Sequence, residues 1–130
     1  MGTVDTHAAA RLVARPERLS RSACAAIRRA GFEGLAIASV TLVEVSQMLA
    51  RGEIKPRGTP QAWLREFVAR TSVAVRDVSI EIAADAGHLP PTFPSDPFDR
   101  LIAATAIVEH MALVTADARI QGSGVVRTIW

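Results

Sequence analysis

Four carboxylates stand beside apolar or helical segments that are far apart along the chain: Asp5, Glu44, Asp99 and Asp117. Asp5 ends the first apolar run, and Asp117 follows the run that begins at Leu113. Glu44 and Asp99 are each expected in the first turn of a helix. If these groups met, they would repel one another unless a cation lay between them, and hard oxygen ligands select Mg²⁺ or Mn²⁺. Such a site supports metal-assisted hydrolysis of a phosphodiester.

Each carboxylate also has a structural interpretation, and the residues alone leave both open. Glu44 has capping-box spacing from Thr41, and the spacing does not separate this role from a ligand role. Asp99 could interact with the dipole of its helix, and Asp117 could cap the turn after its strand. Asp5 is the hardest to explain structurally, because a charge that ends a buried strand is costly without a partner.

Further polar residues adjoin the four carboxylates. Asp96 precedes Pro97, and we expect it to cap the helix that follows rather than to bind metal. Thr6 and Thr115 neighbour the proposed ligands and could orient them. His7 could act as a base, although a local hydrogen bond is the simpler interpretation.

Short apolar runs alternate with amphipathic segments, which predicts the elements that position these groups. We expect extended segments at 1–5, 35–38, 72–75, 112–115 and 125–129, and helices at about 7–14, 20–30, 41–50, 60–70, 80–86 and from 97 onward. This alternation indicates an α/β fold with a parallel sheet covered on both faces. The carboxyl ends of the strands and the beginnings of the crossover helices share one edge, so the four carboxylates are expected to meet there.

Composition narrows the class of protein. The chain has 130 residues, which predicts one domain, and its 49% hydrophobic and 22% charged residues exclude a disordered chain. No apolar stretch approaches the roughly 20 residues that span a bilayer, and nothing resembles a secretion signal. The one cysteine, Cys24, cannot form an internal disulfide. A cytoplasmic protein is therefore expected.

Charge is unevenly distributed along the chain. Residues 1–76 hold 12 basic and 6 acidic side chains, whereas residues 77–130 hold 3 basic and 7 acidic ones. Fourteen of the fifteen basic residues are arginine, which binds phosphate through two parallel hydrogen bonds. A basic half beside an acidic half suits a polyanion held over a metal site, and Arg11, Arg15 and Arg28 are our candidates for holding its phosphates.

Four segments carry a resemblance to a known family. They are Asp5-Thr-His7, Ser39-Val-Thr-Leu-Val-Glu44, Asp96-Pro-Phe-Asp99-Arg-Leu-Ile-Ala-Ala-Thr-Ala106 and Leu113-Val-Thr-Ala-Asp117. In order and spacing the chain resembles a PIN-domain protein, specifically a VapC-type toxin ribonuclease of a type II toxin–antitoxin system.

The resemblance implies a three-layer α/β/α domain over residues 1–130 with a central parallel sheet of four to five short strands. It implies an Mg²⁺-dependent endoribonuclease whose catalytic, metal-binding residues are Asp5, Glu44, Asp99 and Asp117. It also implies an RNA substrate, a cognate antitoxin whose tail blocks the site, and a toxin homodimer.

The sequence departs from the family pattern at three places. Ala8–Ala10 and Arg11 stand where bulky apolar residues are frequent, and Val43 stands where an aromatic residue often precedes the glutamate. Arg119 stands where some relatives carry another acid, which leaves one fewer ligand for a second metal ion.

Two rival functions stay open on the sequence. One is a catalytically silent module of the same fold that acts only through its partner. The other is a phosphatase with Asp5 as nucleophile, although such enzymes usually have an acid two residues later, where His7 stands.

The apolar segment 8–13 is expected to receive a partner's helix unless it packs internally.

Overall fold

The structure is a computed structural model that describes residues 2–130, with the backbone alone at residues 32 and 33. Short strands alternate with helices along the whole chain. In chain order the elements are β1 (Gly2–Val4), α1 (Thr6–Ala14), η1 (Pro16–Arg18), α2 (Arg21–Gly34), β2 (Leu35–Ala38), α3 (Ser39–Ala50), α4 (Pro60–Thr71), β3 (Ala74–Arg76), α5 (Ile80–Gly87), α6 (Pro97–Val108), β4 (Ala112–Val114), α7 (Ala118–Gly122) and β5 (Thr128–Ile129).

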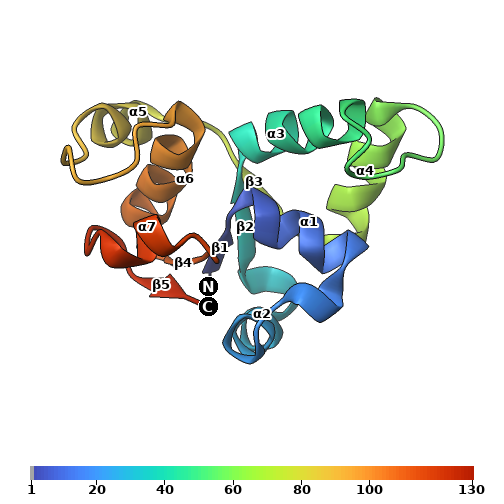
Figure 1. Ribbon diagram of the computed structural model, residues 1–130, viewed down its shortest axis with the longest axis horizontal. Coiled ribbons are helices and arrows are strands. Elements are labelled where there is room, and N and C mark those ends of the chain that lie inside the picture. The colour runs from blue at the N-terminus through green and yellow to red at the C-terminus, as the bar shows by residue number, and fades with distance from the viewer. Residues whose placement is uncertain (1) are drawn as a thin grey trace.

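The five strands form one parallel sheet in the order β3-β2-β1-β4-β5 (Figure 1). β1 lies in the middle, and the chain builds β2 and β3 on one side of it before it builds β4 and β5 on the other. The order therefore reverses between β1 and β4, and a crevice is expected beyond the carboxyl ends of these two strands. The predicted parallel sheet is confirmed.

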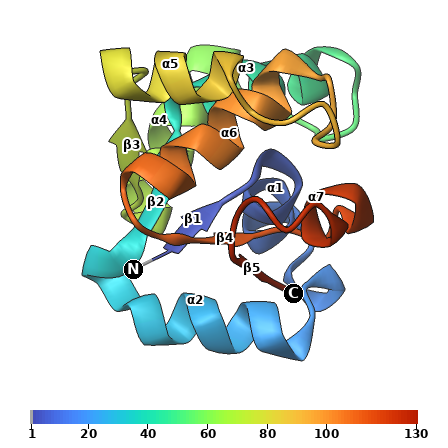
Figure 2. The ribbon, with the colours of Figure 1, turned by 90° about the vertical axis from the view of Figure 1, so that its left-hand side faces the viewer.

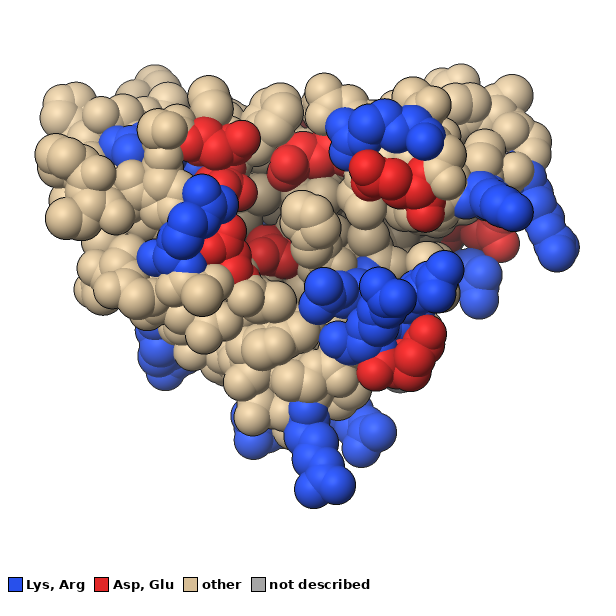
Figure 3. All heavy atoms as spheres, viewed as in Figure 1, with Lys and Arg blue, Asp and Glu red and all other residues tan. Residues whose placement is uncertain are grey.

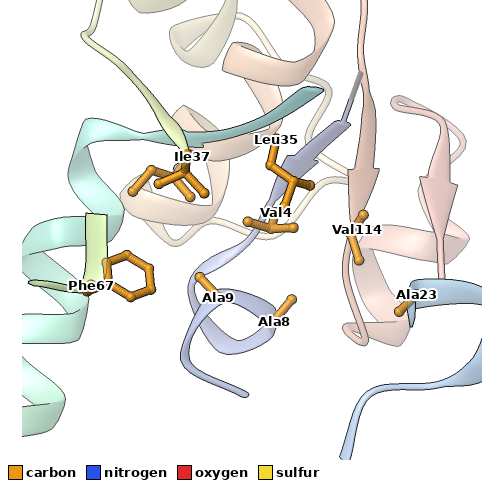
Figure 4. Close-up of a cluster of buried hydrophobic side chains, with 9 residues drawn as sticks. Val4, Ala8, Ala9, Ala23, Leu35, Ile37, Phe67 and Val114 are labelled. Atoms are coloured by element: carbon orange, nitrogen blue, oxygen red, sulfur yellow. The ribbon is translucent and has the colours of Figure 1, made fainter. Parts of the chain in front are cut away.

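Helices cover both faces of the sheet, so the fold has three layers, and Figure 2 shows α2 on one side of the strands and α6 on the other. Successive strand residues point to opposite faces. Val114 joins the cluster under α1, α2 and α4 (Figure 4), whereas Leu113 joins the cluster under α6 and α7. Burying a Leu, Ile or Val side chain contributes about 1.5–3 kcal/mol, so these two clusters fix the position of the helices on the sheet.

Two helices begin directly after a residue whose side chain caps them. Ser20 Oγ accepts a hydrogen bond from the Ala23 amide at 3.0 Å, and Thr59 Oγ1 accepts one from the Ala62 amide at 3.1 Å. A side chain that satisfies one free amide in this way contributes typically about 1 kcal/mol.

Two predicted boundaries are wrong for identifiable reasons. α3 begins at Ser39, directly after β2, and no side chain caps it; the predicted capping box of Thr41 and Glu44 therefore does not exist. β3 begins at Ala74 rather than at Ser72, because Ser72 ends α4 in a left-handed conformation with φ of 55°.

The structure decides the open question about the alanine segment of α1, and the end of the chain differs from expectation. Ala8, Ala9 and Ala10 are at most 5% exposed, so this part of the segment packs internally rather than offering a surface to a partner. The last strand is confined to Thr128–Ile129, and the short helix α7 was not predicted. A helix of 5 residues is too short for hydrophobic periodicity to reveal it.

The segment 88–95 contains three prolines, and one arginine that the sequence did not single out holds it in place. Arg100 Nε donates to the carbonyl of Ala86 at 3.0 Å, and its Nη2 donates to the carbonyl of Leu89 at 2.7 Å. Its Nη1 reaches the carbonyl of Pro94 at 3.4 Å. One guanidinium thus binds three backbone carbonyls around this segment, and it anchors the chain that leads into α6.

Within residues 2–130 no helix combines the length and the apolar character that crossing a membrane requires.

Candidate active site

The four carboxylates singled out by the sequence lie at the carboxyl edge of the sheet. Asp5 follows β1 as the cap of α1, and Asp117 follows β4 as the cap of α7. Asp99 lies in the first turn of α6 as predicted. Glu44 lies in the second turn of α3 rather than the first, because α3 begins at Ser39.

The four side chains act on one another electrostatically. The charge of Asp117 disfavours ionisation of both Asp5 and Asp99, and the charge of Glu44 disfavours that of Asp99. Figure 3 shows acidic side chains gathered in the middle of one face, between the part of the molecule that carries α6 and α7 and the part that carries α1 and α3. We refer to Asp5, Glu44, Asp99 and Asp117 as the acidic cluster.

Asp5 is the most deeply buried member, at 8% exposure. Burial raises the pKa of its carboxyl, and hydrogen bonds from the Thr115 hydroxyl and the Ala8 amide, the latter at 2.8 Å, oppose that rise. Thr115 is fully buried, and its Oγ1 also accepts from the amide of Asp117 at 3.1 Å. Thr115 therefore links the two acids that follow the central strands.

Glu44 is held by the helix that follows the first strand. The Thr6 hydroxyl donates a hydrogen bond to Glu44 Oε1, and Thr6 Oγ1 lies 3.2 Å from Thr41 Oγ1. Both threonines are at most 3% exposed. Burial raises the pKa of Glu44, and repulsion from Asp96 and Asp5 adds to the rise. The sequence paired Thr41 with Glu44 as a cap, whereas the structure places Thr41 behind the threonine that binds Glu44.

Asp99 is strongly perturbed by its surroundings, because burial and then repulsion from Asp96, Glu44 and Asp117 raise its pKa to about 6. Asp96 caps α6, as expected: its Oδ1 accepts from the Phe98 amide at 2.8 Å and from the Asp99 amide at 3.0 Å. The cap thus holds a second negative charge beside Asp99.

Arg119 is a member of the site for which the sequence predicted no contact. Its Nη2 lies 2.9 Å from Asp117 Oδ2 and 3.9 Å from Asp99 Oδ2. The guanidinium lowers the pKa of Asp117. The signal that could have found it is the two-residue spacing after a capping aspartate, which brings the arginine side chain back beside its carboxylate.

The donor set suits a hard divalent cation, because carboxylates predominate and burial leaves Asp5, Glu44 and Asp99 poorly solvated. Within residues 2–130, no three Asp, Glu, His or Cys side chains are already close enough together to hold a metal ion. Binding an ion through three carboxylates therefore requires side-chain rotation at this edge.

The candidate phosphate-binding arginines divide between two hollows. Arg11 and Arg15 line one hollow together with Arg18, which the sequence did not single out, and with His7 and Glu53. We call this the arginine hollow. It adjoins the acidic cluster, since His7 lines it and directly follows Thr6, whose hydroxyl binds Glu44.

Arg28 lies elsewhere. It lines a second hollow with Leu12, Val13, Ile27 and Arg70, between α1, α2 and α4. The structure therefore does not bring Arg28 together with Arg11 and Arg15, and its role in phosphate binding stays a prediction.

Known proteins similar to this chain share its length and its fold. A family model described as PIN domain matches residues 3–122. Ribonuclease VapC22 of Mycobacterium tuberculosis (strain ATCC 25618 / H37Rv) is 37% identical over 131 residues, which cover 98% of this chain and 96% of that protein.

Solved structures agree on the fold. A chain of the VapBC2 structure from Rickettsia felis, bound to a DNA fragment from their promoter, is 20% identical with a TM-score of 0.72 over 97% of this chain and 95% of that chain. A chain of FitAcB from Neisseria gonorrhoeae is 17% identical with a TM-score of 0.68 over 98% and 96%. A toxin–antitoxin complex from Klebsiella pneumoniae is 20% identical with a TM-score of 0.67 over 97% and 95%.

Asp99 yields a prediction about stability in metal-free protein. The pKa of Asp99 is about 6 in the folded state, above the ordinary value of 3.8, so the folded state binds the proton more tightly than the unfolded state. Protonated Asp99 therefore stabilises the fold at low pH, and this stabilisation is lost as the pH rises from 3.8 to about 6. Asp99→Asn cannot ionise. We expect the free energy of unfolding of this variant to exceed that of wild type by on the order of 1–3 kcal/mol at pH 8, and the difference to disappear towards pH 4.

Urea unfolding in a chelating buffer at both pH values measures this difference. Asp85→Asn serves as the control, because Asp85 is an exposed acid on α5. A stability difference for Asp99→Asn that is the same at both pH values would contradict the prediction.

Proposed function

This chain belongs to the PIN-domain family, and from that premise we propose that it is a metal-dependent endoribonuclease, the toxin component of a toxin–antitoxin pair. The relative that is 37% identical across nearly the whole chain is a ribonuclease by name, which supports the reaction class. The observation that carries the proposal is the gathering of four acids, remote in sequence, beyond the carboxyl ends of β1 and β4.

In this proposal Asp5 and Asp99 are the principal ligands of one divalent cation, Mg²⁺ or Mn²⁺. Glu44 and Asp117 complete the site directly or through water. When bound, such a cation supplies a more acidic water and offsets the charge of a phosphodiester under attack. Burial supports this assignment, because carboxylates poorly solvated by water gain most from a cation.

The residues around the acids keep them in place for that role. Thr115 donates to Asp5 and accepts from the amide of Asp117, while Thr6 donates to Glu44. Asp96 uses one oxygen to hold the first turn of α6 and thereby fixes the backbone of Asp99. Hydrogen bonds of this kind orient ligands and commonly change metal affinity by about 10–100-fold when removed.

We propose that RNA phosphates lie in the arginine hollow on their way to the acidic cluster. Arg15 and Arg18 are exposed, and neither forms an ion pair among the described residues. The Arg11 guanidinium lies over the Trp130 ring, with Cζ 5.5 Å from the ring centroid. This contact holds the Arg11 guanidinium beside the hollow. Guanidinium groups beside an acidic metal site would draw the backbone of a polyanion across it.

We further propose that the chain binds an antitoxin. The solved structures similar to it include a toxin–antitoxin complex and a VapBC2 structure. Two features here support such a partner: an acidic cluster that attracts a basic tail, and a hollow lined by Leu12, Val13 and Ile27 that can receive apolar side chains. Self-association into a homodimer stays a prediction.

Substitution of a proposed ligand tests the reaction. We expect Asp5→Asn and Asp99→Asn to lower the rate of RNA cleavage in Mg²⁺ by at least about a hundred-fold, because losing a few kcal/mol of metal-dependent stabilisation has this effect. Chelation should abolish cleavage by wild type, and added Mn²⁺ should restore it.

Asp85→Asn removes the same charge away from the site and should cleave at the wild-type rate. Undiminished cleavage by both ligand variants would overturn the assignment. Growth arrest that survives Asp99→Asn would favour the catalytically silent module instead.

The arginine hollow is tested by binding rather than cleavage. Arg15→Gln combined with Arg18→Gln should weaken the binding of a short single-stranded RNA in Ca²⁺. The slope of log K against log salt concentration should become shallower by about 0.7 for each phosphate that the protein no longer neutralises. Arg65→Gln, exposed on α4, is the control. An unchanged slope in the double variant would place the RNA elsewhere, and Arg28→Gln would then be the next variant to measure.

The partner is tested by co-expression with the protein encoded beside this chain. We expect the two to co-purify as a complex that does not cleave RNA, and we expect Asp99→Asn to weaken the complex because it reduces the charge that holds a basic tail. A complex that cleaves at the full rate would show that the partner leaves the site open.

A further inference from the structure

We propose that Arg119 is a built-in counter-cation of the acidic cluster, occupying the place that a second divalent cation would need and so restricting the site to one ion. This inference rests on the proposed metal-dependent function and concerns how many ions that function uses. The contacts of Arg119, their reach and the charge balance of the cluster support it.

Arg119 occupies both oxygens of Asp117. Its Nη2 donates to Oδ2 at 2.9 Å, and its Nε donates to Oδ1 at 3.3 Å. The backbone amide of Arg119 also donates to Oδ1 at 2.8 Å, which is the capping bond of α7. Because the cap and the side chain come from the same residue, the carboxylate is held on two sides and has little freedom to turn toward an ion.

The same nitrogen reaches a second acid of the cluster. Nη2 of Arg119 lies 3.9 Å from Asp99 Oδ2 as well as 2.9 Å from Asp117 Oδ2. A divalent cation placed between these two carboxylates would lie against the guanidinium, which carries a like charge. Arg119 and a second cation at this position would therefore compete for the same oxygens of Asp117.

Arg119 is the basic side chain that pairs with the cluster among the residues that the structure describes. The remaining ion pairs there join Arg51 to Glu53 and Arg70 to Glu66, and neither includes a member of the cluster. Within the same described residues, Asp5 and Glu44 form no ion pair. The guanidinium therefore pairs closely with Asp117 and only distantly with Asp99, which leaves Asp5, Glu44 and Asp99 for a metal ion.

Repulsion between like charges favours the same number of ions. Asp96 also acts on Asp99 and Glu44, so five ionised carboxylates and one guanidinium carry a net charge of −4. One divalent cation reduces this to −2, and a second cation near Asp117 would have to lie against the like charge of the guanidinium.

The ion pair contributes little to the stability of the fold, so its main effect is the positive charge that it places beside the acidic cluster. The Arg119 side chain is 70% exposed, and exposed ion pairs are screened by water and contribute little to folding. A substitution here should therefore leave the protein folded and change the cation count.

The test is a calorimetric titration of the full chain with Mn²⁺, paired with a thermal melt of each variant. We expect wild type to bind one Mn²⁺ per chain and Arg119→Gln to bind about two, because the freed carboxylates regain their attraction for a cation. Arg119→Lys keeps the charge and should bind one. Arg70→Gln removes an arginine that is similarly exposed, paired with Glu66 at 3.8 Å and outside the cluster, and should also bind one.

Two results would overturn the inference while leaving the metal-dependent function intact: two ions bound by wild type, or one ion bound by a folded Arg119→Gln with wild-type affinity. No binding by wild type or by any variant would instead overturn the proposed metal-dependent function, and this inference with it.

Discussion

The structure depends on one electrostatic constraint: carboxylates buried beside one another at a sheet edge must be held by something other than water. The fold meets this constraint with hydrogen bonds to the acids themselves. Asp5 accepts from the Ala8 amide, Asp117 from the amide of Arg119, and Glu44 from the Thr6 hydroxyl. Helix amides and buried hydroxyls stabilise these charges locally, yet burial still raises the pKa of Asp5, Glu44 and Asp99. The remaining repulsion is what a divalent cation would relieve.

A capping role and the proposed ligand role are compatible for the acids at this edge. The sequence left Asp117 open between a cap and a ligand. In the structure Asp117 caps α7, and the Arg119 side chain donates hydrogen bonds to both of its carboxylate oxygens. Asp5, which had no obvious structural role, caps α1 through one oxygen. A parallel sheet explains the coincidence, because the ends of its strands and the starts of its helices share one edge. Residues at that edge terminate strands, initiate helices and surround any bound ligand at once.

The sequence predicted the parallel sheet and the placement of the four acids at its carboxyl edge, because both follow from the order of short apolar runs and helices. It failed where tertiary contacts decide. α3 begins without a capping side chain because β2 leads straight into it, so the Thr41–Glu44 spacing indicated a cap that does not exist. Arg100 binds three carbonyls around an irregular segment, and no periodicity encodes such contacts. Arg18 lies beside Arg11 because the turn η1 brings residues from two elements around one hollow.

The central claim is that Asp5 and Asp99, from separate segments of the chain, hold a common divalent cation within the acidic cluster. Anomalous diffraction from a crystal soaked in Mn²⁺ locates such an ion directly. The account predicts an anomalous peak within coordination distance of oxygens from both Asp5 and Asp99, beyond the carboxyl end of β1. A peak bound only by exposed acids elsewhere, with Asp5 and Asp99 making no contact to metal, would contradict it.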